Sequence, residues 1–201
     1  MSLTFYYGTM GCGKTTLAIQ HHHNYRSIGR QGRLLTAGER VSGEVMSRLG
    51  PSRRAVEISH GDSLFEYMAN SPSTVDFLVI DEAQFLDVAQ VEELGELADV
   101  HFDIQCYGLL TDFRGELFPG SKALVETADH LVEIPTHVLC WCGEKAIRSA
   151  RVVNGRVTHK GEQILVGDTT EGEVYYAPLC RRHHRVKKLV NSPDPEYTLA
   201  Q

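Results

Sequence analysis

Residues 8–15 are the stretch whose residue types and spacing most clearly predict chemistry. They read GTMGCGKT, a full match to the phosphate-loop pattern of two glycines and a lysine-threonine pair. Gly8 and Gly13 let the backbone curl so that its N–H groups point inward, and Lys14 adds a positive charge for the terminal phosphates of a nucleotide. The Thr15 hydroxyl is then the natural ligand for Mg²⁺. This stretch therefore predicts a site that holds nucleotide phosphates.

Two carboxylates follow the apolar run Phe77–Ile80, which reads as a strand buried on both faces. Asp81 suits the second acidic element of phosphate-loop enzymes, which holds Mg²⁺ directly or through water. Glu82 is the candidate base. A carboxylate here can orient or deprotonate whatever attacks the γ-phosphoryl group, which is water in an ATPase and a hydroxyl in a kinase. The pair alone is compatible with both reactions.

A second group of chemically active residues lies in the last third of the chain. Cys140, Cys142, Cys180 and His183 form two pairs separated by a long insert, which is the pattern of a zinc ribbon. The first pair is one residue tighter than the usual spacing. Two alternatives therefore stay open: His184 replaces one ligand, or Cys140 takes no part. Four protein ligands leave no open position on the metal, so the expected role of zinc is structural.

Strand patterns alternate with helical patterns along the first two thirds of the chain, and this order predicts parallel β-α units. The expected strands are Thr4–Tyr7, 32–38, 55–59, Phe77–Ile80 and 103–110, and the expected helices are 15–25 and 87–100. The phosphate loop thus lies between a strand and a helix, as its chemistry requires. The fold class expected is α/β with a mostly parallel sheet.

The helical segments also predict which side chains are buried. Val88, Val91, Leu94 and Leu97 recur at helical spacing and are expected to pack in the core. The run His21–His23 lies within an expected helix, and we interpret it as part of a solvated face and not as a metal site.

Composition changes near Pro135, where the α/β pattern gives way to a segment rich in Cys, Gly and Thr. We expect a phosphate-loop domain over 1–136 and a small zinc-binding domain over 137–188. Residues 189–201 carry two prolines and no apolar period, which predicts a flexible tail.

Charge and cysteine content limit the classes of partner. The 20 Lys and Arg residues against 26 Asp and Glu residues give a net charge of −6, which disfavours a general nucleic-acid-binding surface. There is no basic and apolar leader and no apolar run of membrane-spanning length, so we expect a soluble cytoplasmic protein without a membrane or nucleic-acid partner. Five cysteines, an odd number, suit a metal site in a reducing compartment better than disulfides.

Five motifs occur in an order that resembles the type II thymidine kinase family over nearly the whole chain: GTMGCGKTT, VIDEAQF, GLLTDFRGELF, CWCG and YYAPLCRRHH. The resemblance implies a RecA-like phosphate-loop domain followed by a zinc-containing lasso domain. It also implies transfer of the γ-phosphate of ATP to the 5′-hydroxyl of thymidine, with Mg²⁺ and a structural Zn²⁺ as cofactors. A homotetramer and feedback inhibition by thymidine triphosphate are further expectations from the same resemblance.

The resemblance assigns roles to single positions, with Glu82 as the general base. It implies ATP contacts at Gly8, Thr9, Met10, Gly11, Cys12, Gly13, Lys14, Thr15, Thr16, Asp81, Glu82, Ala83 and Gln84. It implies thymidine contacts at Met10, Arg40, Phe113, Leu165, Val166, Gly167, Asp168 and Tyr176. One departure concerns Leu110, which stands where the family usually has an aspartate and removes a charge near the sugar.

Three other classes of protein compete with this reading. The letters DEAQ also occur in motor-type and helicase-like ATPases, but such enzymes generally pair two core domains and this chain has room for one. A GTPase would need an N-K-x-D element, which is absent. A nucleotide-sensing or nucleic-acid-binding zinc-ribbon module would need basic and aromatic residues interleaved on the ribbon. Only a few residues here fit that pattern, namely Tyr175, Tyr176 and Arg181.

Overall fold

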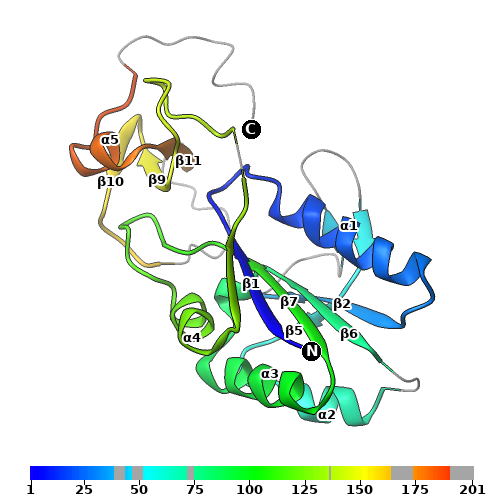
Figure 1. The fold of residues 1–201 in the computed structure, drawn as a ribbon. Helices are drawn as coiled ribbons and strands as arrows, with labels where there is room; N and C mark the ends of the chain where they lie inside the picture. Colours follow the sequence, from blue (N-terminus) through cyan, green and yellow to red (C-terminus); the bar gives the residue numbers. More distant parts are fainter. Residues whose placement is uncertain (39–43, 47–51, 72–74, 136, 164–173, 191–201) are drawn as a thin grey trace. The chain divides into compact units, whose positions relative to one another are not determined.

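The computed structural model describes residues 1–38, 44–46, 52–71, 75–135, 137–163 and 174–190 (Figure 1). The chain forms two compact units. The first contains residues 1–111 and 117–136, and the second contains residues 112–116 and 137–201. The short segment 112–116 therefore belongs with the C-terminal part of the chain, although the sequence around it belongs to the first unit.

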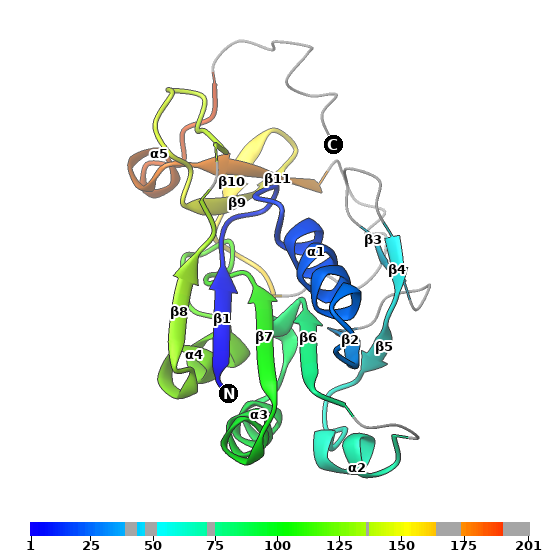
Figure 2. The ribbon, with the colours of Figure 1, turned by 45° about the vertical axis from the view of Figure 1, so that its right-hand side comes forward.

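A six-stranded sheet forms the centre of the first unit, and its strands lie side by side in the order β5-β2-β6-β7-β1-β8 (Figure 2). The strands are β1 (Leu3–Tyr7), β2 (Gly32–Ala37), β5 (Val56–Ile58), β6 (Phe77–Asp81), β7 (Asp103–Gly108) and β8 (His130–Glu133). Every pairing in this sheet is parallel. The predicted α/β fold class with a parallel sheet is confirmed.

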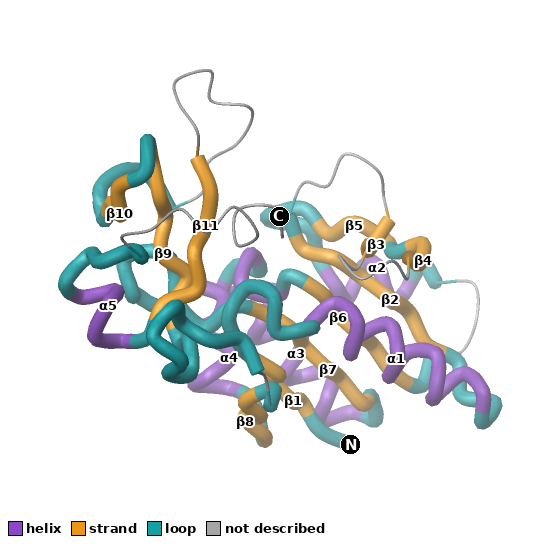
Figure 3. Tube along the Cα trace, turned by 90° about the horizontal axis from the view of Figure 1, so that it is seen from above, coloured by secondary structure: helices purple, strands orange, loops and turns teal. Residues whose placement is uncertain are grey.

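Helices cover both faces of this sheet (Figure 3). The helices are α1 (Lys14–Ser27), α2 (Leu64–Ala69), α3 (Val88–Val100) and α4 (Pro119–Thr127). Strand β6 shows why both faces are apolar. Phe77 and Val79 pack in the cluster that contains residues of α1, whereas Leu78 and Ile80 pack in the cluster that contains residues of α2, α3 and α4. Alternate side chains point to opposite faces, so a continuous apolar run satisfies both layers.

The segment between β6 and α4 is held by close contacts that matter for the site below. A short 3₁₀ turn, η1 (Ala83–Phe85), leads into α3. Asp87 caps α3 by accepting a hydrogen bond from Gln90 N at 2.8 Å, and Gln90 Oε1 accepts one from Asp87 N at 3.0 Å. Gly120 of α4 approaches the turn so closely that a Cβ there would clash with Leu86 O. This part of the first unit therefore leaves little room for displacement.

Two sequence predictions about burial need correction. The solvated face expected for His21–His23 is wrong at two positions, because α1 lies against the sheet. His22 is buried and its ring lies 5.7 Å from the Phe77 ring, and His21 Nδ1 lies 3.0 Å from Gln105 Oε1.

The core predicted for the helix at 87–100 is correct for Val91, Leu94 and Leu97, which are all buried. Val88 is 51 % exposed. It lies in the first turn of α3, where the helix has just begun and one side of the turn still faces solvent.

The second unit contains a three-stranded antiparallel sheet in the order β10-β9-β11. Its elements are β9 (Arg148–Val153), β10 (Arg156–Thr158), β11 (Val174–Leu179) and the short helix α5 (Arg181–Arg185). Asn154 and Gly155 connect β9 to β10 with φ values of +49° and +72°. Positive φ at both positions is the geometry of a two-residue hairpin turn, for which Asn-Gly is the favoured sequence.

A separate antiparallel pair, β3 (Glu44–Met46) and β4 (Ser52–Arg54), belongs to the first unit. Among the described residues, no helix combines the length and the apolar character needed to cross a membrane.

Candidate functional site

The phosphate loop connects the carboxyl end of β1 to the amino end of α1. Gly11 and Gly13 have φ values of +80° and +88°, which favour glycine over other residues. A Cβ on Gly8 would lie 2.5 Å from Cys12 Sγ, so the Cys12 side chain fills the space that the first glycine leaves. Of the two pattern glycines expected to let the backbone curl, Gly13 thus has a positive φ and Gly8 does not, and Gly11 adopts it in addition; α1 begins directly after Gly13.

Lys14 lies at the first position of α1 and is 8 % exposed. Its Nζ donates hydrogen bonds to Thr9 O at 2.9 Å and to Gly8 O at 3.3 Å. The ammonium group is thus held over its own loop. Together with the backbone amides at the start of α1, it makes this loop a positively polarised site that suits an anion.

A hydrogen bond joins the loop to the end of β6. Thr15 Oγ1 donates to Asp81 Oδ2 at 2.9 Å, although the two residues are 66 positions apart in the chain. Asp81 is fully buried. A hydroxyl and a carboxylate oxygen are the hard ligands that Mg²⁺ prefers, so this pair fits a magnesium ion.

Glu82 follows Asp81 and adopts a left-handed backbone conformation with φ +53°. Gln84 fixes its carboxylate: Gln84 Nε2 donates to Glu82 Oε2 at 2.7 Å. Gln84 is itself held, because its Oε1 accepts a hydrogen bond from Leu109 N at 2.9 Å. Non-glycine residues with positive φ cost about 1–3 kcal/mol and cluster at functional sites. The turn therefore presents a glutamate in a strained but well-fixed geometry.

The tether between Gln84 and Glu82 was not anticipated from the sequence. Sequence reasoning placed Gln84 only among the ATP contacts. The hydrogen bond depends on the positive φ at Glu82, and no local pattern in the sequence predicts that conformation.

In the second unit, the four predicted metal ligands lie together. Their ligand atoms, from Cys140, Cys142, Cys180 and His183, are all within 4.8 Å of one another. Cys140 Sγ lies 3.3 Å from His183 Nδ1, and Cys142 Sγ lies 4.0 Å from Cys180 Sγ. Zinc–sulfur bonds of about 2.3 Å in a tetrahedron place two sulfurs about 3.8 Å apart, so the cluster fits Zn²⁺.

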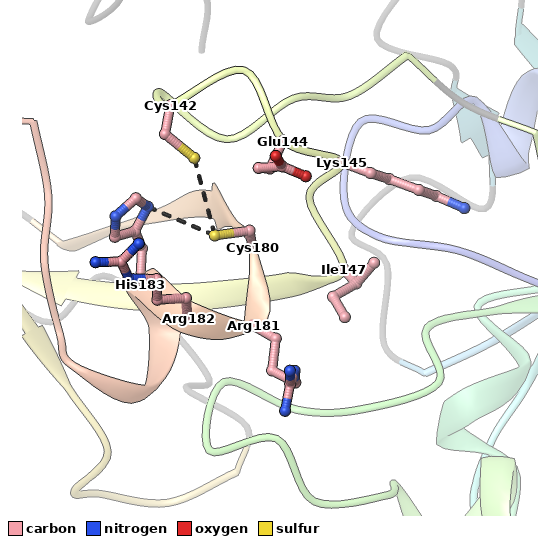
Figure 4. Close-up of a pocket in the computed structure, with 8 residues that line it drawn as sticks. All are labelled: Cys142, Glu144, Lys145, Ile147, Cys180, Arg181, Arg182 and His183. Carbon is pink, nitrogen blue, oxygen red and sulfur yellow. Dashed lines mark hydrogen bonds between the residues drawn. The ribbon is translucent and has the colours of Figure 1, made fainter.

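Figure 4 shows Cys142, Cys180 and His183 converging on one side of a pocket of about 550 Å³. Burial acts to raise the pKa of the Cys180 thiol, but hydrogen bonds from the His183 backbone and from neighbouring thiols lower the pKa below its usual value. A lowered pKa favours the thiolate, which is the form that binds metal. The Trp141 ring stacks on the His183 ring at 4.2 Å and supports this side of the cluster.

A tight turn explains how two cysteines separated by one residue can share a metal. Gly143 N donates to Cys140 O at 2.8 Å, and Gly143 has a φ of +85°. The chain therefore reverses directly after Cys142. The alternative ligand His184 points elsewhere, since its Nε2 donates to Phe113 O at 2.8 Å.

Phe113 lies in the turn 112–116, which belongs to the second unit although the residues on both sides of it belong to the first. Asp112 builds this turn: its Oδ1 accepts hydrogen bonds from Arg114 N at 2.8 Å and from Glu116 N at 3.0 Å. Burial acts to raise the pKa of Asp112, but the hydrogen bond from the Arg114 side chain and those from the backbone lower the pKa below its usual value. Sequence reasoning missed Asp112, although aspartate followed three residues later by glycine is a turn signal.

The other predicted nucleoside contacts are distributed over both units. Met10 lies in the phosphate loop and Tyr176 on β11. Leu110 packs against the main apolar core of the first unit. Arg40 and the stretch Leu165–Asp168 lie outside the described residues.

The fold and these sites define a phosphate-loop α/β protein with an appended cluster of three cysteines and one histidine. The sequence model of the thymidine kinase family matches residues 1–184. The chain belongs to the thymidine kinase family.

Several proteins named thymidine kinase are similar to this chain. One from Streptomyces avermitilis is 44 % identical over 190 residues, which cover 91 % of this chain and 88 % of the relative. One from Cutibacterium acnes is 43 % identical over 189 residues, with 91 % of this chain and 88 % of the relative covered. One from Mesorhizobium japonicum is 40 % identical over 199 residues, with 96 % and 95 % covered.

Proposed function

We propose that this protein transfers the γ-phosphate of ATP to the 5′-hydroxyl of thymidine and so produces thymidine monophosphate for nucleoside salvage. Membership of the thymidine kinase family and the names of its relatives support the acceptor. The observation that supports the chemistry is the hydrogen bond from Gln84 to the Glu82 carboxylate. Glu82 directly follows Asp81, which is hydrogen-bonded to the phosphate loop.

In this proposal the phosphate loop binds ATP. The backbone amides and the Lys14 ammonium hold the phosphate oxygens, while Thr15 and Asp81 hold Mg²⁺. When bound, Mg²⁺ supplies positive charge that neutralises the phosphates during transfer. The remaining predicted ATP contacts, at Thr9, Met10, Thr16 and Ala83, belong to the same two segments.

Glu82 is the proposed general base. Its carboxylate accepts the proton of the 5′-hydroxyl as the oxygen attacks the γ-phosphoryl group, and Gln84 keeps the carboxylate pointing in one direction. Phosphoryl transfer needs little other covalent chemistry from the protein, so the two side chains contribute this proton transfer and the orientation of the base.

The proposed thymidine contacts are Met10, Arg40, Phe113, Leu165–Asp168 and Tyr176. An apolar lining of this kind suits a flat pyrimidine. Zinc, held by Cys140, Cys142, Cys180 and His183, would stabilise the second unit and take no part in the transfer. The domain boundaries at 136 and 188, the tetramer and the cytoplasmic location stay predictions.

A panel of acceptors tests the proposal. Purified protein is incubated with ATP and, separately, with thymidine, other nucleosides, single-stranded DNA and RNA. We expect only pyrimidine deoxynucleosides to accept phosphate, with thymidine monophosphate as the product. Stimulation by nucleic acid with release of free phosphate would instead identify a motor-type ATPase.

A further inference from the structure

Arg151 is a buried cation in the middle of the small sheet, and the sequence analysis did not single it out. It lies on β9, the central strand, and is 2 % exposed. In the described part of the chain it forms no ion pair with a carboxylate. Burying an arginine without a carboxylate partner is costly, so its contacts call for an explanation.

The guanidinium group of Arg151 contacts both aromatic residues that are proposed to bind the nucleoside. Its central carbon lies 3.7 Å from the centroid of the Phe113 ring. Its Nε and Nη2 donate to the Tyr176 hydroxyl at 3.1 and 3.0 Å. Arg151 and Tyr176 are also directly opposite each other in the β9–β11 ladder.

Two backbone carbonyls fix the far side of the same group. Nη1 donates to Glu162 O at 2.8 Å, and Nη2 donates to Gln163 O at 3.1 Å. Gly161 allows this close approach: its φ is +109°, and a Cβ there would lie 3.3 Å from Nη1. The guanidinium plane is therefore held in one orientation by groups from three chain segments.

The backbone around Phe113 is fixed independently. His184 Nε2 donates to Phe113 O, and Gln163 Nε2 donates to Asp112 Oδ2 at 3.2 Å. The Phe113 ring is itself buried, with 2 % of its residue surface exposed. The Arg151 guanidinium covers one face of this ring more closely than that of Arg114, which lies 5.6 Å from the centroid, so Arg151 helps to set the orientation of the ring.

We propose that Arg151 is a positioning residue for nucleoside binding, which sets the orientation of the Phe113 ring and of the Tyr176 hydroxyl at the same time. This inference rests on the proposed function, because it assumes that these two side chains contact thymidine. Arg151 touches neither the phosphates nor the base in this scheme. Its loss should therefore change the affinity for the nucleoside and leave ATP binding unchanged.

The test compares Arg151→Met and Arg151→Lys with the wild-type enzyme. Methionine keeps the length of the side chain and removes the charge, whereas lysine keeps the charge and removes the planar fork. Arg156→Met on β10 is the matched control, because Arg156 is exposed. The measurements are kcat, KM for thymidine and for ATP, the thymidine Kd by calorimetry, and the zinc content of each protein.

We expect Arg151→Met to raise the thymidine KM and Kd by about 10- to 100-fold, since small displacements of binding groups have effects of this size. Arg151→Lys should give a smaller rise. The ATP KM should stay within about twofold of the wild-type value, and zinc should be retained. A thymidine KM and Kd within about twofold of wild type in Arg151→Met would overturn the inference.

Tyr176→Phe provides a second test, on the other side of the hydrogen bond. It keeps the ring and removes only the hydroxyl that accepts from Arg151. We expect a higher thymidine KM than in wild type, and a combined effect with Arg151→Lys smaller than the product of the single effects. If the rise in thymidine KM in the double variant equalled the product of the two single rises, Arg151 and Tyr176 would act independently, which would contradict a shared role. A wild-type enzyme that fails to phosphorylate thymidine would instead refute the proposed function itself.

Discussion

Glu82 is the side chain on which the proposed chemistry depends most. Glu82→Gln keeps the size of the side chain and its contact distance to Gln84 but cannot accept a proton. We expect kcat to fall by about 10²- to 10⁴-fold, the usual contribution of a general base, with the KM for ATP little changed. Steady-state kinetics at saturating thymidine measure this effect.

Glu92→Gln is the control for that substitution, since Glu92 is exposed on α3. It should behave as wild type. Near-normal turnover of Glu82→Gln at saturating ATP and thymidine would remove Glu82 from the role of base.

Single residues differ in how far the sequence predicts their role. In the phosphate loop the positive φ of Gly13 could be predicted, because it is a local property that glycine satisfies, whereas that of Gly11 could not. The contact of Gln84 with Glu82 and that of Arg151 with Phe113 could not. Each of these contacts is between side chains that only the tertiary structure brings together. A hydrogen bond or ring contact of this kind has no periodic pattern in the sequence that could predict it.

At the level of elements, the approach of α4 to the turn after β6 supports the site. A Cβ on Gly120 would clash with Leu86 O and lie 2.9 Å from Gln84 O, and both of these are backbone atoms. We therefore expect Gly120→Ala to destabilise the protein by about 1–3 kcal/mol, as overpacking does, and to lower kcat by shifting Gln84. Chemical denaturation gives the free energy of unfolding.

The control in the same helix is Lys122→Ala. Lys122 is 64 % exposed and its contact with Glu126 is 3.9 Å, so its loss should change stability by less than about 0.5 kcal/mol. If Gly120→Ala were as stable and as active as Lys122→Ala, the turn would have more freedom than the structure indicates.

The turn at Cys140 makes a prediction for the metal cluster. Cys140→Ser removes a thiolate from a set whose ligand atoms lie within 4.8 Å of one another. We expect this variant to lose zinc and to unfold locally around β9 and β11, because ribbon folding is coupled to metal binding. Metal analysis and the fluorescence of Trp141, which stacks on His183, report the two effects.

Cys106→Ala is the comparison for Cys140→Ser. Cys106 is buried on β7, outside the cluster. It should keep its zinc. A Cys140→Ser protein that binds zinc as wild type does would assign the metal to other ligands.

Helix α1 makes a prediction about pH. Burial against the sheet is the largest cause that lowers the pKa of His22 below 6.5, and Arg26 acts in the same direction, whereas the Gly32 backbone acts in the opposite one. The folded protein therefore binds this proton less readily than the unfolded chain does. The stability that neutral His22 contributes is present above 6.5 and is lost as pH falls from that value towards the lower folded pKa.

The free energy of unfolding should therefore fall as the pH drops below about 6.5, and this fall should be smaller in His22→Phe. His130→Gln, at an exposed position on β8, should keep the full wild-type dependence. An identical pH dependence in His22→Phe and wild type would contradict the burial argument.

For the whole molecule, the sequence predicts the layers of the fold better than their order. Alternating strand and helix patterns are enough to predict a parallel sheet covered by helices. They do not predict that β7 lies between β1 and β6, because that order depends on which strands pair after the chain has collapsed. The sequence also does not predict that residues 112–116 belong to the second unit, because this depends on contacts such as the one between His184 and Phe113.

The central claim for the molecule is that the phosphate held by the loop is passed to a nucleoside and not to water. The most direct measurement is the stoichiometry of a single reaction with ATP and thymidine, in which ADP, thymidine monophosphate and free phosphate are all quantified. We predict equal amounts of ADP and thymidine monophosphate, very little free phosphate, and almost no ADP when thymidine is omitted. Formation of ADP with an equal amount of free phosphate, unchanged by thymidine, would contradict the claim.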